Sequence, residues 1–563
     1  LYKIILLMQK RAKQIIHWNT TLHPIDFPKD IKNFFFELSL GNRSKFVNWM
    51  GKISKNNFDN LDWWIKLPAS RDPYKSNLYK NIIILMVLKS KKFNKNIFSL
   101  VVDSEALVKT IQNQKSINTD ICKIKIKKSN YSLILFLKSI VFQIVIFLLV
   151  KILSQEKFLK KINKITLIDT FVSCNEKLKD FVYPGLDKII KKNKIKNIFF
   201  VPNIVFSRNI FNLIKNIVIM TRKNYIFKEH YINLKEFFLC FYQTLYSFPK
   251  NIEKFKKYYG IDCTLIIRDE LHSKKDFYTE FQSRLKLSFI KDLKLKKLAI
   301  KKAIGRFENH SIDKAWNYGF RKYFPKIELL GYQGFLWLPH LANESPTSYE
   351  DKAKIIPKKI ILTGKILRKP RLEFYKKLKV IIGPSLGKQE IFNSFKKTYK
   401  YKFVVALCGI KSLDEKMILW SKDVIKNSKK LRIIIKPHPI LPLNKIINLK
   451  ELNIYNNRIT IFNEDIKSLL QKTDVLISSG PTSVVFESIA YGCKLFYLFL
   501  DPSDPLIFKN IPVSKTYFTF INNKEDLLKN MNSHYRKKDR KFNKKFKSSF
   551  YTKINKSNIK IFL

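Results

Sequence analysis

Short apolar runs alternate with helix-like segments through the second half of the chain, and this alternation constrains the fold more than any other feature. The runs that read as strands are residues 359–362, 380–382, 403–407, 431–435, 458–461, 474–477 and 494–498. Between two of these runs, Leu413, Met417, Trp420 and Val424 recur at helical spacing. Strands that alternate with helices predict a parallel, doubly wound sheet, so we expect residues 350–530 to form a Rossmann-like domain.

The first half of the chain shows the same alternation less clearly. Its strand candidates are residues 98–102, 165–168, 198–201, 264–267, 302–307 and 327–330. Turn-forming residues gather in the segment 339–357, which predicts a hinge near residues 335–357. We therefore predict an α/β chain with two Rossmann-like domains facing a cleft, the first over residues 1–340. Residues 531–563 are predicted to be a basic C-terminal tail, whose run 536–547 is either a solvated tail or the face of a helix, with a contact to lipid headgroups as a further alternative.

Two of the predicted strands end on polar residues that suit an anion. The run 431–435 leads into Lys436 and His438, and the run 474–477 leads into a turn of small residues that opens a helix. Ligands of open α/β sheets bind at the carboxyl ends of strands, where a helix start offers free backbone N–H groups. The sequence therefore predicts a nucleotide or sugar-phosphate site at Lys436, His438, Ser478, Ser479, Gly480, Thr482, Ser483 and Glu487.

This pair of strand ends resembles the donor half of GT-B glycosyltransferases of bacterial surface polysaccharide assembly. Kdo transferases and polysialyltransferases of capsule synthesis carry an HP motif, then a Ser/Thr-rich motif and a Glu; CDP-glycerol glycerophosphotransferases carry a related pair. The resemblance implies that Glu487 holds the ribose of a CMP-sugar. It also implies that the nucleotide phosphate is held by His438, Ser478, Ser479, Thr482 and Ser483.

Glycosyl transfer needs a base for the acceptor hydroxyl and charge stabilisation for the leaving phosphate. His438 is the candidate for the second role. For the base we choose Glu308, which directly follows a predicted strand of the first, acceptor-side domain. Three other carboxylates also follow strand candidates and stay alternatives: Asp103, Glu105 and Asp169. Related enzymes often show an E-N…G-x-Q-H pattern here, but this chain has Gly334 in place of the His, which weakens a catalytic assignment to that loop.

The sequence contains no recognisable motif for binding a metal ion or a cofactor. The acidic pair Asp501 and Asp504 flanks Pro502 and reads as a turn, and neither a Gly-rich phosphate loop nor a GxGxxG motif is present. We therefore expect a metal-independent reaction without a cofactor, in which the nucleotide-activated sugar is the donor substrate.

The formal net charge of +64 raises the question of nucleic-acid binding. The lysines are spread over the whole chain, and the composition is rich in Lys, Asn, Ile and Phe, as A/T-rich codons favour. We therefore expect no nucleic-acid partner, but attraction to acidic substrates and to the anionic inner membrane surface. The six cysteines form no CxxC motif, which favours the cytoplasm, and the opening apolar run is too short for a secretion signal.

Residues 131–153 are strongly apolar, but their longest uncharged run, 139–150, has 12 residues. A membrane span needs about 20. We predict a helix that is buried or lies at the membrane interface, so that the protein is cytoplasmic and peripheral to the inner membrane. A short span is the alternative if the side chain of Lys138 extends to the headgroups.

These observations predict a glycosyltransferase of capsule or lipopolysaccharide synthesis. It would move a Kdo- or sialic-acid-like sugar from a CMP donor to a growing glycan or glycolipid. One alternative is a polyol-phosphate transferase that uses a CDP donor. The other is a basic nucleic-acid-binding protein, although no binding module is recognisable.

Overall fold

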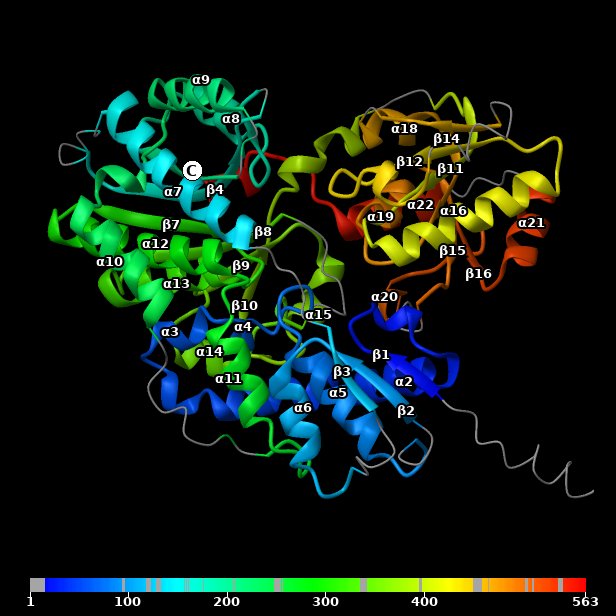
Figure 1. Cartoon of the computed structure of the whole chain (residues 1–563). Coiled ribbons are helices and arrows are strands. Elements are labelled where there is room, and N and C mark those ends of the chain that lie inside the picture. The colour runs from blue at the N-terminus through cyan, green and yellow to red at the C-terminus, as the bar shows by residue number, and fades with distance from the viewer. Residues whose placement is uncertain are drawn as a thin grey trace, which may run out of the picture.

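The structure is a computed structural model of the chain. It describes residues 16–93, 97–117, 123–127, 133–155, 157, 159, 162–175, 177–205, 207, 209–247, 255, 257–334, 342–393, 397–448, 458–463, 465–501, 505–508, 511–534 and 540–563. Within these residues the strands form sheets of three, seven and six strands, which lie in three lobes (Figure 1).

The six-stranded sheet forms the second domain. Its strands are β11 (Tyr401–Ala406), β12 (Ile433–Lys436), β13 (Ile459–Ile461), β14 (Thr473–Ser478), β15 (Lys494–Leu498) and β16 (Phe518–Ile521). All pairs are parallel and the order is β13-β12-β11-β14-β15-β16. Numbered along the chain this order is 3-2-1-4-5-6, which is the Rossmann order. The helices of this domain are α16 (Lys411–Lys426), α18 (Ile466–Lys472), α19 (Val484–Ala490), α20 (Pro505–Phe508), α21 (Lys524–Asn532) and α22 (Arg540–Phe550).

The seven-stranded sheet forms the first domain. Its strands are β4 (Ile165–Ser173), β5 (Lys179–Asp180), β6 (Ile198–Ile204), β7 (Ile300–Arg306), β8 (Glu328–Gln333), β9 (Lys359–Leu362) and β10 (Lys379–Ile382). The parallel strands run in the order β6-β4-β7-β8-β9-β10, and β5 pairs antiparallel with the end of β4. The helices are α7 (Leu133–Leu153), α8 (Leu186–Lys192), α9 (Ile210–Thr221), α10 (Leu234–Tyr246), α12 (Phe277–Leu295), α13 (Ser311–Tyr323), α14 (Ser348–Lys352) and α15 (Arg368–Arg371). The prediction of an α/β chain with two Rossmann-like sheets is confirmed.

The predicted hinge at residues 335–357 is wrong. β8 and β9 lie on either side of that segment and pair in one sheet, from Leu330 opposite Lys359 to Gln333 opposite Leu362. The segment therefore connects two strands of the first domain. The prediction failed because turn-forming residues mark a change of chain direction whether or not a domain ends there. The chain passes to the second sheet after β10, so the boundaries 1–340 and 350–530 need correction.

A third lobe, not predicted, occupies the N-terminal side of the first half. Its strands β1 (Ile16–Asn19), β2 (Ile97–Val102) and β3 (Lys123–Ile126) form a small parallel sheet. Its helices are α2 (Lys29–Ile53), α3 (Leu61–Trp64), α4 (Leu67–Ser70), α5 (Leu78–Lys89), α6 (Glu105–Gln112) and α11 (Thr264–His272). The strand predicted at residues 264–267 is therefore wrong, since an apolar run of four residues fits either the face of a helix or a strand.

Of the two main predictions for the basic C-terminal run, the helix is confirmed over the described residues 540–550 and the solvated tail is wrong. In α22, Phe546 and Phe550 are buried, and Phe550 stacks on Phe486 of α19 with ring centroids 5.1 Å apart. The last residues then return to the first domain, where Phe562 packs on Tyr332 (Figure 1). The helix has a buried face because phenylalanines recur every four residues among its lysines. The C-terminal segment therefore ties the two domains together.

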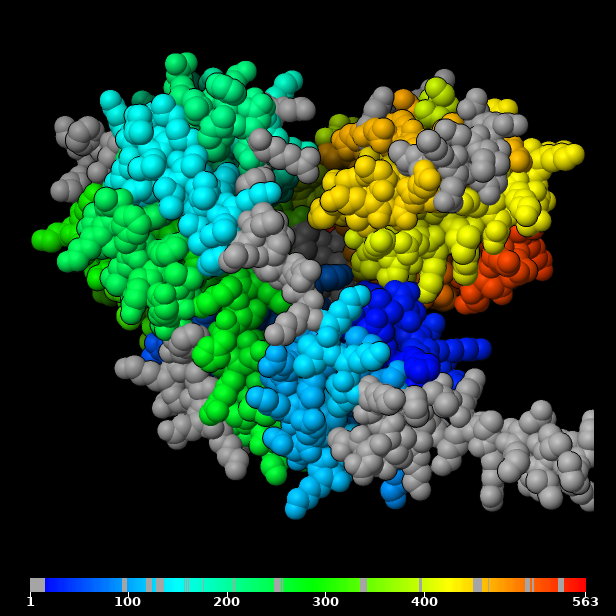
Figure 2. Space-filling view, viewed as in Figure 1, coloured from blue at the N-terminus to red at the C-terminus, as the bar shows by residue number. Residues whose placement is uncertain are grey.

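Helix α7 accounts for the apolar segment 131–153; residues 131 and 132 lie outside the described part. By length and composition alone, one helix among the described residues could cross a membrane, and 28% of its apolar window, Phe136–Leu153, is buried. Its inner side packs into the first domain through Phe142, Ile146 and Val150. Figure 2 shows that the molecular surface is hollowed where the first and second domains meet.

Candidate functional site

The order of the second sheet fixes where its ligand crevice lies. The strand order reverses between β11 and β14, and ligands of such sheets bind outside the carboxyl ends of the strands at that point. β11 ends before Cys408 and Gly409, and β14 ends before Ser479 and Gly480. Both turns contain a glycine with positive φ, +85° at Gly409 and +72° at Gly480. The predicted Ser/Thr-rich loop is thus at the switch point.

His438 lies against Gly409 at the carboxyl end of β12. A Cβ atom at position 409 would approach the His438 Nδ1 to 2.5 Å, so the ring position requires a glycine there. The backbone N–H of Ile440 donates to His438 Nδ1 at 3.3 Å, which in a neutral ring leaves the proton on Nε2 as a donor. Burial, followed by the charge of Lys436, lowers the pKa of His438. The imidazole is therefore a neutral donor at pH 7, placed to meet an anion.

Lys436 is the last residue of β12 and is half-buried. Burial lowers the pKa of its ammonium group, and the carboxylate of Asp465 partly offsets this effect. Lys436 and His438 thus lie at the same sheet edge as the Ser/Thr-rich loop.

The residues of the Ser/Thr-rich loop differ in what they can do. The Ser478 hydroxyl is fully buried and donates to the Ala406 carbonyl at 2.8 Å, so it joins β14 to β11 and its predicted phosphate contact is wrong. The Ser479 hydroxyl is buried without a hydrogen-bond partner. Thr482 and Ser483 are half-exposed and remain available to a ligand.

Glu487 lies one turn into α19 and is held from two sides. The Ser483 hydroxyl donates to Glu487 Oε1 at 2.7 Å, and Lys388 Nζ lies 2.6 Å from the same oxygen. Lys388 comes from the segment that connects the two domains, and no sequence pattern pointed to it. Only the second oxygen of the carboxylate is left for a ribose hydroxyl, so the predicted ribose role requires Oε2.

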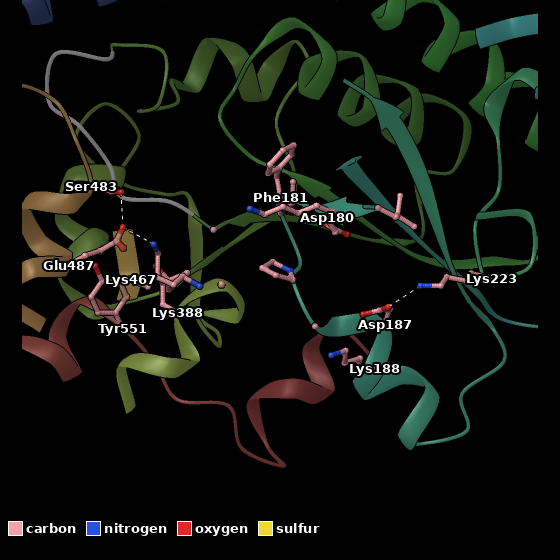
Figure 3. A pocket seen from close by; sticks show the side chains of 18 of the residues that line it. Asp180, Phe181, Asp187, Lys188, Lys223, Lys388, Lys467, Ser483, Glu487 and Tyr551 are labelled. Carbon is pink, nitrogen blue, oxygen red and sulfur yellow. Dashed lines mark hydrogen bonds and ion pairs between the residues drawn. The ribbon is translucent and has the colours of Figure 1, made fainter. Parts of the chain in front are cut away.

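A cavity of about 600 Å³ lies between the two domains, and Glu487, Ser483 and Lys388 are part of its lining (Figure 3). Ser483, Glu487 and Lys467 line it from the second domain, and Lys388 lines it from the connecting segment. The first domain contributes the segment after β4, including Lys179, Asp180, Asp187 and Lys188, with Lys223 and Gly334. Five lysines face three carboxylates in this lining, an excess of positive charge that suits a phosphate group. We call this space the interdomain cavity.

Glu308 follows β7 at the carboxyl edge of the first sheet, as predicted. Its Oε2 lies 3.0 Å from Arg306 NH1 and 3.1 Å from His310 Nε2, and His310 Nδ1 lies 3.5 Å from Asp72 Oδ2. Burial opposes ionisation of Glu308, but the charges of Arg306 and His310 outweigh it and lower its pKa to about 2. A carboxylate with so low a pKa is a weak proton acceptor by itself.

The loop that carries Glu308 and His310 is fixed by its own neighbours. The Asp313 carboxylate accepts from the backbone N–H groups of Glu308 at 2.9 Å and His310 at 3.2 Å. Asn309 adopts a positive φ of 60°, and its side chain donates to Glu350 Oε1 and to the Asn343 carbonyl. The imidazole is therefore preorganised between two carboxylates. The sequence signal for His310 is the adjacent E-N-H, in which the prediction names only the Glu.

The alternative bases are placed elsewhere. Asp169 is fully buried within β4, where its Oδ2 lies 2.6 Å from Lys286 Nζ, so it belongs to a structural ion pair and its candidacy is wrong. Asp103 accepts from Asn77 at 3.0 Å, and Glu105 is exposed at the start of α6; both belong to the N-terminal lobe.

A second cavity, of about 580 Å³, lies between the N-terminal lobe and the second domain. Gly409, Ile410 and Pro481 line it from the switch point, while Asp72 and Tyr74 line it from the N-terminal lobe. Asp72 is also the carboxylate beside His310, at 3.5 Å from Nδ1, so one lining residue of this space contacts the Glu308–His310 pair, which does not itself line the cavity. We call it the lobe cavity. The Ser478–Ser483 loop therefore lines both cavities, through Ser483 on one and Pro481 on the other.

Within the described part of the chain, no group of three or more His, Cys, Asp and Glu side chains could hold a metal ion. The expectation of a metal-independent reaction without a cofactor stays a prediction.

No protein-family model and no curated protein matches the chain. Among solved structures it is similar to S. aureus MnaA with UDP, at 10% identity over 71% of this chain and 92% of that chain, with a TM-score of 0.38. The pneumococcal O-GlcNAc transferase GtfA with UDP and GlcNAc gives 10% identity, coverage of 69% and 96%, and a TM-score of 0.40. Acinetobacter baumannii MurG gives 9% identity over 70% of this chain and 97% of that chain, with a TM-score of 0.35.

Likenesses this distant assign neither a family nor an activity. The chain's own strands establish the fold: an α/β protein in which two Rossmann-like domains border a shared cavity.

Proposed function

We propose that this protein is a glycosyltransferase of bacterial surface carbohydrate synthesis, with a nucleotide-activated sugar as donor and a glycan or glycolipid as acceptor. The observation that carries the proposal is the pair of cavities at the switch point of the second sheet. They provide two substrate spaces that share the Ser478–Ser483 loop. A volume of about 600 Å³ is within the range of roughly 300–1,000 Å³ for small-molecule sites.

The donor occupies the interdomain cavity. Its ribose meets Glu487 and Ser483 in the cavity lining, and its phosphate extends beyond that lining to His438, Lys436 and the backbone around Gly480 and Thr482. Positive charge from Lys388 and Lys467 favours the same placement. The HP and Ser/Thr motifs support a CMP donor that carries a Kdo- or sialic-acid-like sugar.

The acceptor hydroxyl enters from the lobe cavity. The Glu308–His310 pair removes its proton as the new bond to the anomeric carbon forms and the bond from that carbon to the phosphate oxygen breaks. We assign proton removal to the pair rather than to Glu308 alone, because the low pKa of Glu308 makes it a weak acceptor. His438 stabilises the charge that develops on the departing phosphate.

A thermal-shift panel of CMP, CDP, UDP and GDP at fixed salt tests this proposal. A ligand that binds only the folded chain stabilises it by about 2.7 kcal/mol at a hundredfold excess over Kd. We expect CMP to give the largest shift. A shift with CDP alone would favour polyol-phosphate transfer, and no shift with any nucleotide would reject a nucleotide-dependent transferase.

We further propose that the protein works in the cytoplasm, peripheral to the inner membrane. The support is helix α7, which is apolar over its length yet packs one side into the first domain.

A further inference from the structure

Three neighbouring helices of the first domain expose apolar side chains that the fold does not use. On α7 the exposed residues Leu137, Val141, Leu148 and Ile152 lie at helical spacing along one stripe. Val141 is 58% exposed and Ile152 is 76% exposed. The opposite side of α7 holds the buried residues, so these four side chains are not needed for packing.

Helix α10 repeats this arrangement. Leu234, Phe238, Tyr242 and Tyr246 are exposed and follow one another every four residues. Helix α9 adds Phe211 at its start, which is 78% exposed.

Helix α7 contacts both of the other helices. Phe147 of α7 meets Phe237 of α10 with ring centroids 4.3 Å apart, and α7 also packs along α9. Figure 2 shows α7 and α9 together on the surface of the first domain. We call the exposed stripes of α7, α9 and α10 the three-helix face. Exposed apolar side chains gathered on neighbouring helices in this way mark an interaction surface.

Charge on these helices distinguishes among partners. Their charged residues are Lys138, Lys151, Lys215, Lys235 and Glu236, four basic and one acidic. Anionic lipid headgroups attract such a fringe of lysines, while apolar side chains enter the boundary of the acyl chains. Two copies of the chain would instead bring lysines against lysines, with a formal charge of +64 on each copy.

We propose that the three-helix face docks this protein on an anionic lipid bilayer, with α7, α9 and α10 lying in the plane of the interface. α7 does not cross the bilayer in this arrangement. A span would withdraw Phe142, Ile146 and Val150 from the core and break the hydrogen bond that joins Gln143 to Gln282 of α12. The proposal extends the peripheral location proposed above to a defined surface; its test uses no nucleotide, so the docking surface and the transferase activity can fail separately.

Vesicle flotation of the full chain tests the proposal. Vesicles of phosphatidylglycerol mixed with phosphatidylcholine should bind the protein, and vesicles of phosphatidylcholine alone should bind it at least about tenfold less. The double variant Val141→Glu with Phe238→Glu should lose more than about tenfold of the binding, since each change places a charge where an apolar side chain enters the membrane. Leu419→Glu is the matched control, because Leu419 is 54% exposed on α16 of the other domain; it should bind as the parent does.

A second variant does not depend on the apolar substitutions being tolerated. Lys138→Gln with Lys215→Gln and Lys235→Gln changes three exposed side chains and should reduce binding to the anionic vesicles by about tenfold or more. Parental binding by both variants would overturn the proposal, as would equal binding to both vesicle types. Retention in the membrane after carbonate extraction would identify a span instead. A dimer in sedimentation that Val141→Glu with Phe238→Glu dissociates would identify an interface between copies.

Discussion

The carboxyl edges of the two large sheets are built in opposite ways. At the edge of the first sheet, Arg306 and His310 both contact Glu308, and Asp313 fixes the loop that carries Glu308 and His310. At the edge of the second sheet, glycine turns and hydroxyls dominate, and the His438 ring accepts one weak hydrogen bond from its own loop. The first edge has fixed charged side chains, whereas the second leaves donors open to a ligand.

This difference suits a division of labour. Proton removal requires groups held in one geometry, because catalysis falls steeply when the base is displaced. Binding of a nucleotide requires donors that are accessible and not yet satisfied by the protein. We therefore expect substitutions at the first edge to affect turnover and stability, and those at the second edge to affect affinity.

The largest expected effect is on turnover. Glu308→Gln keeps the shape of the side chain but removes the negative charge beside His310. Transfer should fall by about 10²–10⁴, while the affinity for the donor nucleotide stays near the parental value. Steady-state transfer and equilibrium nucleotide binding, measured on the same preparation, separate the two effects. Glu328→Gln is the control. Glu328 is the first residue of β8 and so lies at the edge of the sheet opposite to Glu308, and its substitution should leave transfer and nucleotide affinity unchanged.

A double variant sharpens this prediction. If Glu308 and His310 act as one unit, Glu308→Gln with His310→Gln should be no slower than the slower single variant. Losses that multiply would show that the two residues act separately. A parental rate in Glu308→Gln would move the base elsewhere, with Asp103 and Glu105 as the next candidates.

The second effect concerns the stability of the first domain. Lys286→Met leaves the Asp169 carboxylate buried without its partner at 2.6 Å, and breaking a buried ion pair in this way costs about 3–5 kcal/mol. Urea unfolding should show that loss, whereas Lys291→Met on the exposed side of the same helix should change stability by less than about 0.5 kcal/mol. A neutral Lys286→Met variant would show that this charged core is not a rigid support for the catalytic edge.

The sequence predicted most strands of the second domain, but not β16, because the central strands are apolar runs separated by helices. The strands predicted over residues 403–498 correspond to β11 to β15, and the HP segment and the Ser/Thr loop follow β12 and β14, the strands on either side of β11. Local pattern is informative where each strand is one uninterrupted apolar run.

Long-range packing set the limits of prediction. The pairing of β8 with β9 and the return of Phe562 to the first domain depend on contacts between distant segments, which no local pattern records. The same holds in the candidate site. Lys388 contacts Glu487 from the segment that connects the domains. The Ser478 hydroxyl donates a hydrogen bond to the Ala406 carbonyl of the neighbouring strand β11. Residue type indicated a capable side chain, and tertiary contacts decided whether it was available.

The third effect is on affinity at the second edge. His438→Ala removes a donor to the phosphate, and a hydrogen bond to a charged group is worth roughly 1.5–3 kcal/mol. Nucleotide affinity should fall about ten- to a hundredfold, since 1.4 kcal/mol corresponds to a factor of ten. Calorimetric titration measures the change, and the melting temperature of the free protein should barely move. Ile440→Ala in the same exposed loop should bind normally; parental affinity in His438→Ala would refute the phosphate assignment.

The smallest expected effect is on the pH dependence of that affinity. Burial and Lys436 hold the pKa of His438 below its ordinary 6.5, so the ring is neutral at pH 7 and takes up a proton as the pH falls. A bound phosphate favours the protonated ring, so nucleotide affinity should rise by roughly two- to fivefold as the pH falls from 7.5 to 5.5.

The effect of His438 on folding stability has the opposite sign. The unfolded chain protonates first, so this group costs stability as the pH falls below about 6.5 and none well above it. The difference between the parent and His438→Ala in nucleotide titrations across this range isolates the ring from the phosphate's own titration, and identical pH profiles would mean that His438 does not touch the phosphate.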